Sequence, residues 1–163
     1  MTNWRAMTEA DLPAVQALAD AAHPGLPERP EVLADKLRHF PEGCRALARG
    51  AAVAGYGIAH PWTLDAVPKL DAPLGGLPAR PGCLYLHDVV VDPAARGQGA
   101  AAAYVTLMAT LARARGLPAL ALVSVHETWP MWQRHGFRVV DRLGLVAVLG
   151  DYGPSARYML RPS

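Results

Sequence analysis

Residues Leu86–Ala101 of this chain read Leu-His-Asp-Val-Val-Val-Asp-Pro-Ala-Ala-Arg-Gly-Gln-Gly-Ala-Ala. The β-branched run predicts a strand, and the alanine-rich residues after the two glycines predict the start of a helix. Gly97 and Gly99 allow a tight turn between these elements, and the first amides of the helix have no acceptor within it. The helix dipole and the charge of Arg96 favour an anion at this end, so the turn predicts a pyrophosphate site. A plain glycine turn before a surface helix is the alternative.

A second pattern in the same residues, Gly97-x-Gly99-x-x-Ala102, formally matches the dinucleotide fingerprint. That fingerprint places its first glycine at the strand end, whereas Asp92–Arg96 intervene here. It also requires an acidic residue about 20 positions later, where the chain has only the apolar stretch Leu117–Leu122. We therefore exclude a nicotinamide-dependent enzyme.

The composition is that of one globular domain, which we expect to span residues 1–163. The chain is 52% apolar and 18% charged, which excludes disorder as its main state. Its net charge of +2 comes without a cluster of Lys or Arg, so no nucleic-acid partner is expected.

The two cysteines, Cys44 and Cys83, adjoin apolar sequence, so we expect buried thiols and not a disulfide. No zinc-ligand spacing occurs, and no metal site is predicted. Met1–Arg5 lacks the apolar stretch of a signal peptide, and no apolar run reaches the length of a membrane span. The expectation is a cytoplasmic protein without a membrane partner.

The pattern of elements along the whole chain predicts a mixed α/β domain of the α+β type. The β-α-β unit over residues 84–125 predicts one parallel crossover between antiparallel halves. Strands are expected at Asn3–Met7, Cys44–Arg49, Ala51–His60, Leu84–Val91, Ala119–Val125, Phe137–Leu149 and Ala156–Leu160. Helices are expected at Asp11–Ala22, Pro30–Phe40 and Gly99–Arg115, with a short one after Thr128, and the proline-rich stretch Pro61–Gly82 is expected to be a long loop.

Two motifs in order resemble those of one enzyme family. Arg96-x-x-Gly99-x-Ala101 after the Val89–Pro93 segment resembles motif A of the GNAT superfamily of N-acetyltransferases. Residues Trp132–Phe137 are similar to the family's Tyr-x-Lys/Arg-x-Gly-Phe signature near the C-terminal end. The order of elements also matches, so the resemblance covers essentially the whole chain. It implies a single GNAT-like domain with a mostly antiparallel central sheet and helices on both faces.

The resemblance also implies where acetyl-CoA, the co-substrate, binds. In the family, the strands that match Leu84–Val91 and Ala119–Val125 splay apart, and acetyl-CoA enters the gap. Main-chain groups of Val89 and Val91 are then expected to pair with the pantetheine arm, and the Val89 amide to polarise the thioester oxygen. His126 stands where many relatives have an asparagine that contacts the cofactor, although a surface histidine is the alternative. The pyrophosphate is expected on the amides of Gly97, Gln98, Gly99, Ala100 and Ala101, beside Arg96.

Acetylation of an amine requires a neutral nitrogen, so a general base is expected. Asp88 and His87 stand at the strand position where the family often places this base, and Glu127 after the next strand is a further candidate. A structural hydrogen bond is the alternative role for Asp88. In a regular strand His87 and Asp88 face opposite sides, unless a bulge re-aims the pair. The family's tyrosine, which protonates the leaving thiolate, is matched here by Trp132, whose indole N–H donates a hydrogen bond but is not an acid. A purely structural role for Trp132 is the alternative.

The function implied is transfer of an acetyl group from acetyl-CoA to a primary amine of a small molecule or peptide. A catalytically silent acyl-CoA-binding domain and a protein N-terminal or lysine acetyltransferase are the alternatives. Position alone suggests Tyr56, His60, Trp62 and the loop after them as the wall of the acceptor pocket. Dimers are common among relatives, so a homodimer is left open.

Overall fold

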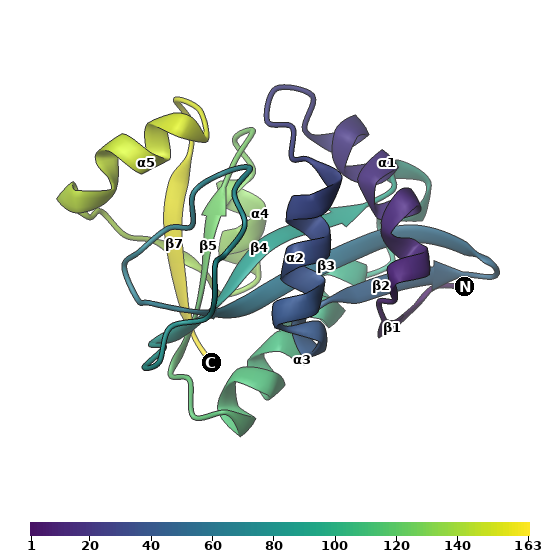
Figure 1. The fold of residues 1–163 in the computed structure, drawn as a ribbon, viewed down its shortest axis with the longest axis horizontal. Helices are drawn as coiled ribbons and strands as arrows, with labels where there is room; N and C mark the ends of the chain where they lie inside the picture. Colours follow the sequence, from purple (N-terminus) through teal and green to yellow (C-terminus); the bar gives the residue numbers. More distant parts are fainter.

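One twisted sheet organises the chain in the computed structural model, which describes residues 1–163 (Figure 1). Its strands follow the order β1-β2-β3-β4-β5-β7-β6, and β4 and β5 are the one parallel pair. The strands are β1 (Asn3–Ala6), β2 (Arg45–Arg49), β3 (Ala52–Trp62), β4 (Cys83–Val91), β5 (Ala119–Ser124), β6 (Arg138–Val139) and β7 (Arg157–Pro162).

Helices cover both faces of this sheet. The helices α1 and α2 lie over one face, and α3 lies over the other (Figure 1). The predicted fold class is therefore confirmed, including the single parallel β-α-β crossover. The helices are α1 (Leu12–Ala22), α2 (Pro30–His39), α3 (Ala100–Ala114), α4 (Trp129–Arg134) and α5 (Val146–Asp151).

Each face of the sheet has its own apolar core. On one face, fully buried Tyr104 and Met108 of α3 pack against Leu84 and Leu120. On the other, Val15 and Leu33 of the first two helices belong to the cluster around Ile58. Cys44 and Cys83 are buried free thiols, as expected, and burial raises the pKa of each to about 12.

The pairing of β4 with its two neighbours is irregular in the centre of the sheet, where the candidate site lies. The parallel pairing of β4 with β5 joins Leu84–Leu86 to Leu120–Leu122 and goes no further. Beyond Leu86 this edge of β4 is open, because β5 has left it. On the other edge, Asp88 pairs with Ile58 and Leu86 with Ala59, so His87 is the extra residue of a β-bulge.

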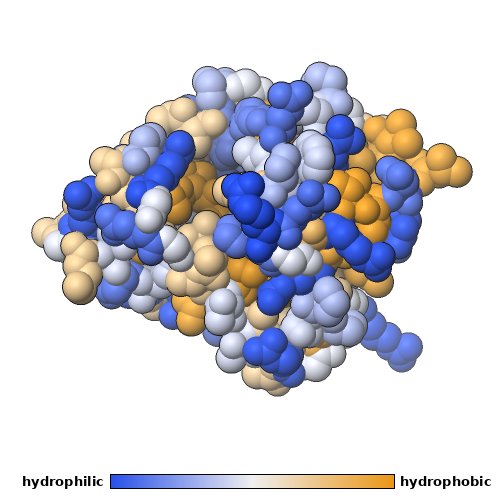
Figure 2. Space-filling view, turned by 180° about the vertical axis from the view of Figure 1, so that it is seen from behind, coloured by the Kyte–Doolittle hydropathy of each residue, from blue (hydrophilic) through white to orange (hydrophobic).

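The strand predicted for Phe137–Leu149 is wrong in most of its length. Only Arg138–Val139 forms a strand, and a 3₁₀ turn at Leu143–Leu145 leads into α5. Leu145, Val148 and Leu149 pack on the cluster around Tyr85 and Tyr158. Their spacing of three and four residues is helical, and the continuous apolar run concealed it. Figure 2 shows the apolar side chains that gather over α5 at one edge of the molecule.

The loop predicted from Pro61 begins two residues later, because β3 continues to Trp62. Pro61 is tolerated in the strand because β2 pairs with β3 only as far as Gly57, so no neighbour requires its missing N–H. None of the helices has the length and apolar composition that crossing a lipid bilayer requires.

Candidate active site

The turn between β4 and α3 has the geometry that binds an anion. Gly97 and Gly99 adopt φ values of +81° and +76°, in the left-handed region that favours glycine. A Cβ built on either residue meets no atom within 4 Å, so the space beside both is open. No main-chain amide from Gly97 to Ala101 donates to an acceptor in the protein. These unpaired donors, at the positive end of a 15-residue helix, fit a phosphate group.

A cavity of about 550 Å³ adjoins this turn. Arg96 lines it and is held there because its Nε donates to the Val91 carbonyl at 3.1 Å. Gln98 is exposed and does not line the cavity, so only its amide remains a candidate contact. Of the residues predicted to bind the cofactor, the cavity brings together Val89, Val91, Arg96, Gly97, Gly99, Ala100, Ala101 and His126.

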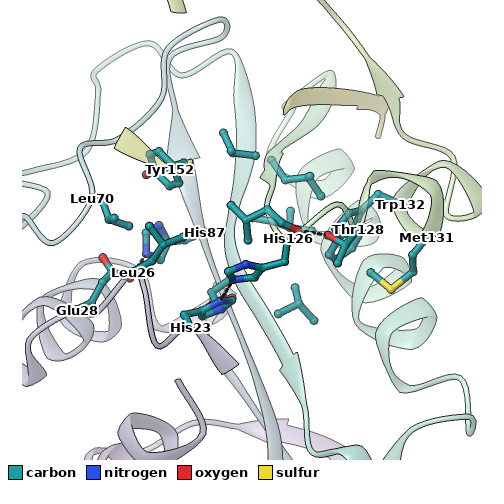
Figure 3. A pocket seen from close by; sticks show the side chains of 16 residues that line it. His23, Leu26, Glu28, Leu70, His87, His126, Thr128, Met131, Trp132 and Tyr152 are labelled. Atoms are coloured by element: carbon teal, nitrogen blue, oxygen red, sulfur yellow. Dashed lines mark hydrogen bonds and ion pairs between the residues drawn. The ribbon is translucent and has the colours of Figure 1, made fainter. Parts of the chain in front are cut away.

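A second cavity, of about 130 Å³, lies beside the first and shares six residues with it. Figure 3 shows His23 and His126 in its centre, between one group with Glu28, Leu70 and Tyr152 and another with Thr128, Met131 and Trp132. The shared residues are His23, Val89, His126, Thr128, Met131 and Trp132. The two cavities therefore meet at the pair of histidines.

Asp88 lines the smaller cavity and holds two hydrogen bonds. The Tyr56 hydroxyl donates to its Oδ2 at 2.5 Å, and Nε2 of His23 lies 3.0 Å from its Oδ1. Burial and the neighbouring charge of Asp88 raise the pKa of Tyr56, which therefore remains a neutral donor. The carboxylate thus orients His23 through its Nε2–H.

His126 extends this chain by one more group, because its Nε2 lies 3.1 Å from Nδ1 of His23. Since His23 donates to Asp88 from Nε2, its Nδ1 in the neutral form accepts from Nε2–H of His126. Neutral His126 then keeps a lone pair at Nδ1, which has no partner in the protein. His126 has a φ of +55°, a left-handed conformation that is uncommon outside glycine.

The pKa of His23 is shifted by opposing effects. Burial lowers it, whereas the hydrogen bond and charge of Asp88 and the charge of Glu28 raise it, and the net shift is upward. A proton that reaches His23 is therefore stabilised beside Asp88.

His87 has a different environment from Asp88, although the bulge allows both to line the small cavity. Its Nε2 lies 2.6 Å from Glu28 Oε1, and its Nδ1 is buried without a partner. Burial raises the pKa of Glu28, but the charge and hydrogen bond of His87 outweigh this effect and lower it to about 2. The arrangement suits His87 to hold Glu28 in place.

Trp132 is 7% exposed and lines both cavities while packing edge-on against Phe137. Its indole Nε1 makes no hydrogen bond within the protein, and the residue lines the cavity. Glu127 is exposed and lines neither cavity, so the structure does not bring this predicted base to the others.

The acceptor-pocket residues suggested by position need correction. His60 is fully buried, with Nδ1 3.0 Å from the Pro61 carbonyl oxygen, and neither it nor Trp62 lines the small cavity. Tyr56 reaches the site only through its hydroxyl, and the loop contributes Leu70. Sequence reasoning missed His23, Glu28 and Tyr152, for which no local motif gives a signal.

Comparison with known proteins agrees with this geometry. The model of the acetyltransferase (GNAT) family matches residues 5–137. This chain belongs to that family. A search of curated proteins finds no similar sequence.

Solved structures with the GNAT fold superpose on nearly the whole chain. Ard1 from Thermoplasma volcanium has a TM-score of 0.76 and 16% identity, over 99% of this chain and 97% of that one. A Mycobacterium tuberculosis protein solved with CoA has a TM-score of 0.72 and 19% identity, over 99% of each chain. GphF, a GNAT-like decarboxylase solved with isobutyryl-CoA, has a TM-score of 0.79 and 19% identity, over 98% of each. At these identities the likeness shows the fold, and GphF shows that this fold also hosts another reaction.

Proposed function

We propose that this GNAT protein transfers the acetyl group of acetyl-CoA to a primary amine of a small molecule. The observation that carries the proposal is the hydrogen-bonded chain Tyr56–Asp88–His23–His126, where the two cavities meet. A base at this point suits an amine, whose nitrogen must lose a proton to react.

The larger cavity supplies the donor site in this proposal. The amides of Gly97–Ala101 and the guanidinium of Arg96 hold the pyrophosphate, and the open edge of β4 at Val89 and Val91 lies along the pantetheine arm. Bound in this way, acetyl-CoA supplies an activated acyl group. The protein's main contribution is to fix the thioester against the amine.

The proton follows the chain of histidines. As the C–N bond forms and the C–S bond breaks, Nδ1 of His126 takes a proton from the amine nitrogen. The Nε2 proton of His126 passes to Nδ1 of His23, so the positive charge comes to rest beside Asp88. CoA leaves as a thiolate, toward which the indole N–H of Trp132 donates a hydrogen bond. Asp88 acts as a positioning residue, because it touches His23 and not the reacting atoms.

Small molecules are favoured over peptides because the acceptor side is covered. The Tyr152 hydroxyl donates to the Pro68 carbonyl at 2.6 Å, which joins the segment before β7 to the 63–82 loop. The Leu74 amide donates to Asp35 at 2.7 Å, which joins the same loop to α2. These bonds hold the loop that carries Leu70 against the small cavity, which supports a small acceptor over an extended peptide in this proposal.

A second candidate is a silent acyl-CoA-binding domain, favoured by Trp132 in place of the family's tyrosine. Release of thiol from acetyl-CoA, measured with a panel of small amines, separates the two. We expect release that depends on the amine and a mass increase of one acetyl group on it.

Acetyl-CoA binding without release on the whole panel would support the silent domain and overturn the transferase. Peptides with free N-termini, tested in parallel, would overturn the small-molecule assignment if they alone were acetylated.

A further inference from the structure

We infer that the acceptor is a compact amine with an apolar substituent and no carboxylate, as opposed to an amino acid. The inference rests on the proposed function and adds the substrate class. It comes from the size, the lining and the charges of the small cavity.

The cavity accommodates a compact group. Its volume is about 130 Å³, and an apolar protein cavity of about 150 Å³ accommodates benzene. Leu26, Leu70 and the ring of Tyr152 line it on the side of Glu28 (Figure 3). Leu86 also lines it. An alkyl or aryl substituent of about the size of benzene is therefore buried there against apolar side chains.

No lysine or arginine lines this cavity. Each of its two carboxylates pairs with a histidine: Asp88 with His23, and Glu28 with His87. The charge of Lys36 interacts with Glu28, but the side chain of Lys36 is buried and does not line the cavity. A substrate carboxylate would thus lie near two anions, with no lysine or arginine to bind it and with Nε2 of His23 and Nε2 of His87 already paired to those anions, which is costly.

An incoming amine has the opposite electrostatics. A primary ammonium group is attracted by Glu28 and Asp88 as it enters the cavity, and it loses its first proton to solvent before the neutral amine attacks. Glu28 stays anionic across the physiological range, because its pKa lies at about 2. The same two carboxylates that repel an amino acid's carboxylate therefore favour the amine.

Matched pairs of substrates test this inference. Phenethylamine and phenylalanine differ by the carboxylate alone, as do isopentylamine and leucine. We expect kcat/KM to be at least about 100-fold higher for each amine, since burying an unpaired charge costs several kcal/mol. Phenylalanine amide, which keeps the size but loses the charge, should recover part of the difference.

A substitution gives the reciprocal test. Leu70→Arg places a cation at the cavity wall and should reduce the preference for amine over amino acid by about 10-fold. Leu64→Arg is the control, because Leu64 lies in the same loop, is 41% exposed and lines no described cavity; it should leave the preference unchanged.

Equal kcat/KM for amine and amino acid would overturn the substrate class and leave the transferase standing. Acetyl-CoA binding by calorimetry with no turnover of these compounds or of the whole amine panel would overturn both.

Discussion

At the scale of single residues, Asp88 and His87 show how one bulge separates two neighbouring side chains into different roles. Asp88 orients His23, and His87 orients Glu28. Each histidine thus meets one carboxylate, and the two pairs face the same small cavity. Only the pair that includes His23 continues to His126, where the cavities meet.

Asp88→Asn should lower kcat about 100-fold with little change in the KM for acetyl-CoA, because the imidazolium of His23 loses its stabilising charge. Asp88 raises the pKa of His23, so its loss leaves burial to lower that pKa. The acidic limb of the kcat/KM profile should therefore move to lower pH.

The pH profile of each variant measures this shift. Asp141→Asn, an exposed carboxylate outside both cavities, should leave profile and rate unchanged. An acidic limb that stays in place in Asp88→Asn would contradict the assignment of His23 as the group that holds the proton.

At the scale of elements, we expect the start of α3 to bind the donor and the 63–82 loop to contact the acceptor. The start of α3 presents unpaired amides, which are main-chain groups and need no particular side chains. The loop is positioned by side chains of α2 and of the residues before it. Arg29 contacts Asp71 from its main-chain amide and its guanidinium, and Glu28 accepts the amide of Asp71.

Gly99→Trp should weaken CoA binding about 100-fold, or about 2.8 kcal/mol, because its side chain enters the phosphate site. Gly116→Trp is a matched control, since Gly116 also has a positive φ of +69° and open space, but lies beyond the other end of α3. The free energy of unfolding should fall by a similar amount in both variants, roughly 1–2 kcal/mol, because a tryptophan is strained in the left-handed conformation. Calorimetric titration with CoA checks the difference, and equal affinity in the two variants would remove the turn from the site.

Asp71→Ala should raise the KM for the amine several-fold and leave the KM for acetyl-CoA unchanged, because the loop beside Leu70 is no longer held. The free energy of unfolding should change little, since the Arg29–Asp71 pair is exposed. Glu31→Ala is the control, because Glu31 also pairs with Arg29 but does not hold the loop. Steady-state kinetics with each substrate varied in turn measures both constants, and an unchanged KM for the amine would contradict the role of the loop.

At the scale of the whole molecule, the site joins segments from most of the chain onto one sheet. The end of α1, the residues before α2, the bulge of β4, the end of β5 and the segment before β7 all line the small cavity. The free energy of unfolding should therefore depend on buried charges of the site such as Glu28, whose side chain is 9% exposed.

The free energy of unfolding should fall as pH drops from about 4.5 to about 2. The pKa of Glu28 is lowered from 4.5 to about 2 in the folded protein, so its contribution is present above 4.5 and is lost as pH approaches 2. The loss from this group should be about 3 kcal/mol. Urea unfolding at a series of pH values measures it, and Glu28→Gln should flatten this part of the curve while exposed Glu9→Gln should not. Parallel curves for the wild type and Glu28→Gln would contradict the coupling.

The sequence by itself determined the fold class, the β-α-β crossover and the glycine turn between β4 and α3. Each depends on contiguous residues, because glycine dihedrals, helix starts and strand patterns are local properties of the chain. Only the tertiary structure decided the partners of Asp88 and His87. His23 lies 65 positions from Asp88, and Glu28 lies 59 positions from His87, so packing alone brings them together. The helix α5 also depended on packing, since an apolar run adopts whichever period buries it against its neighbours.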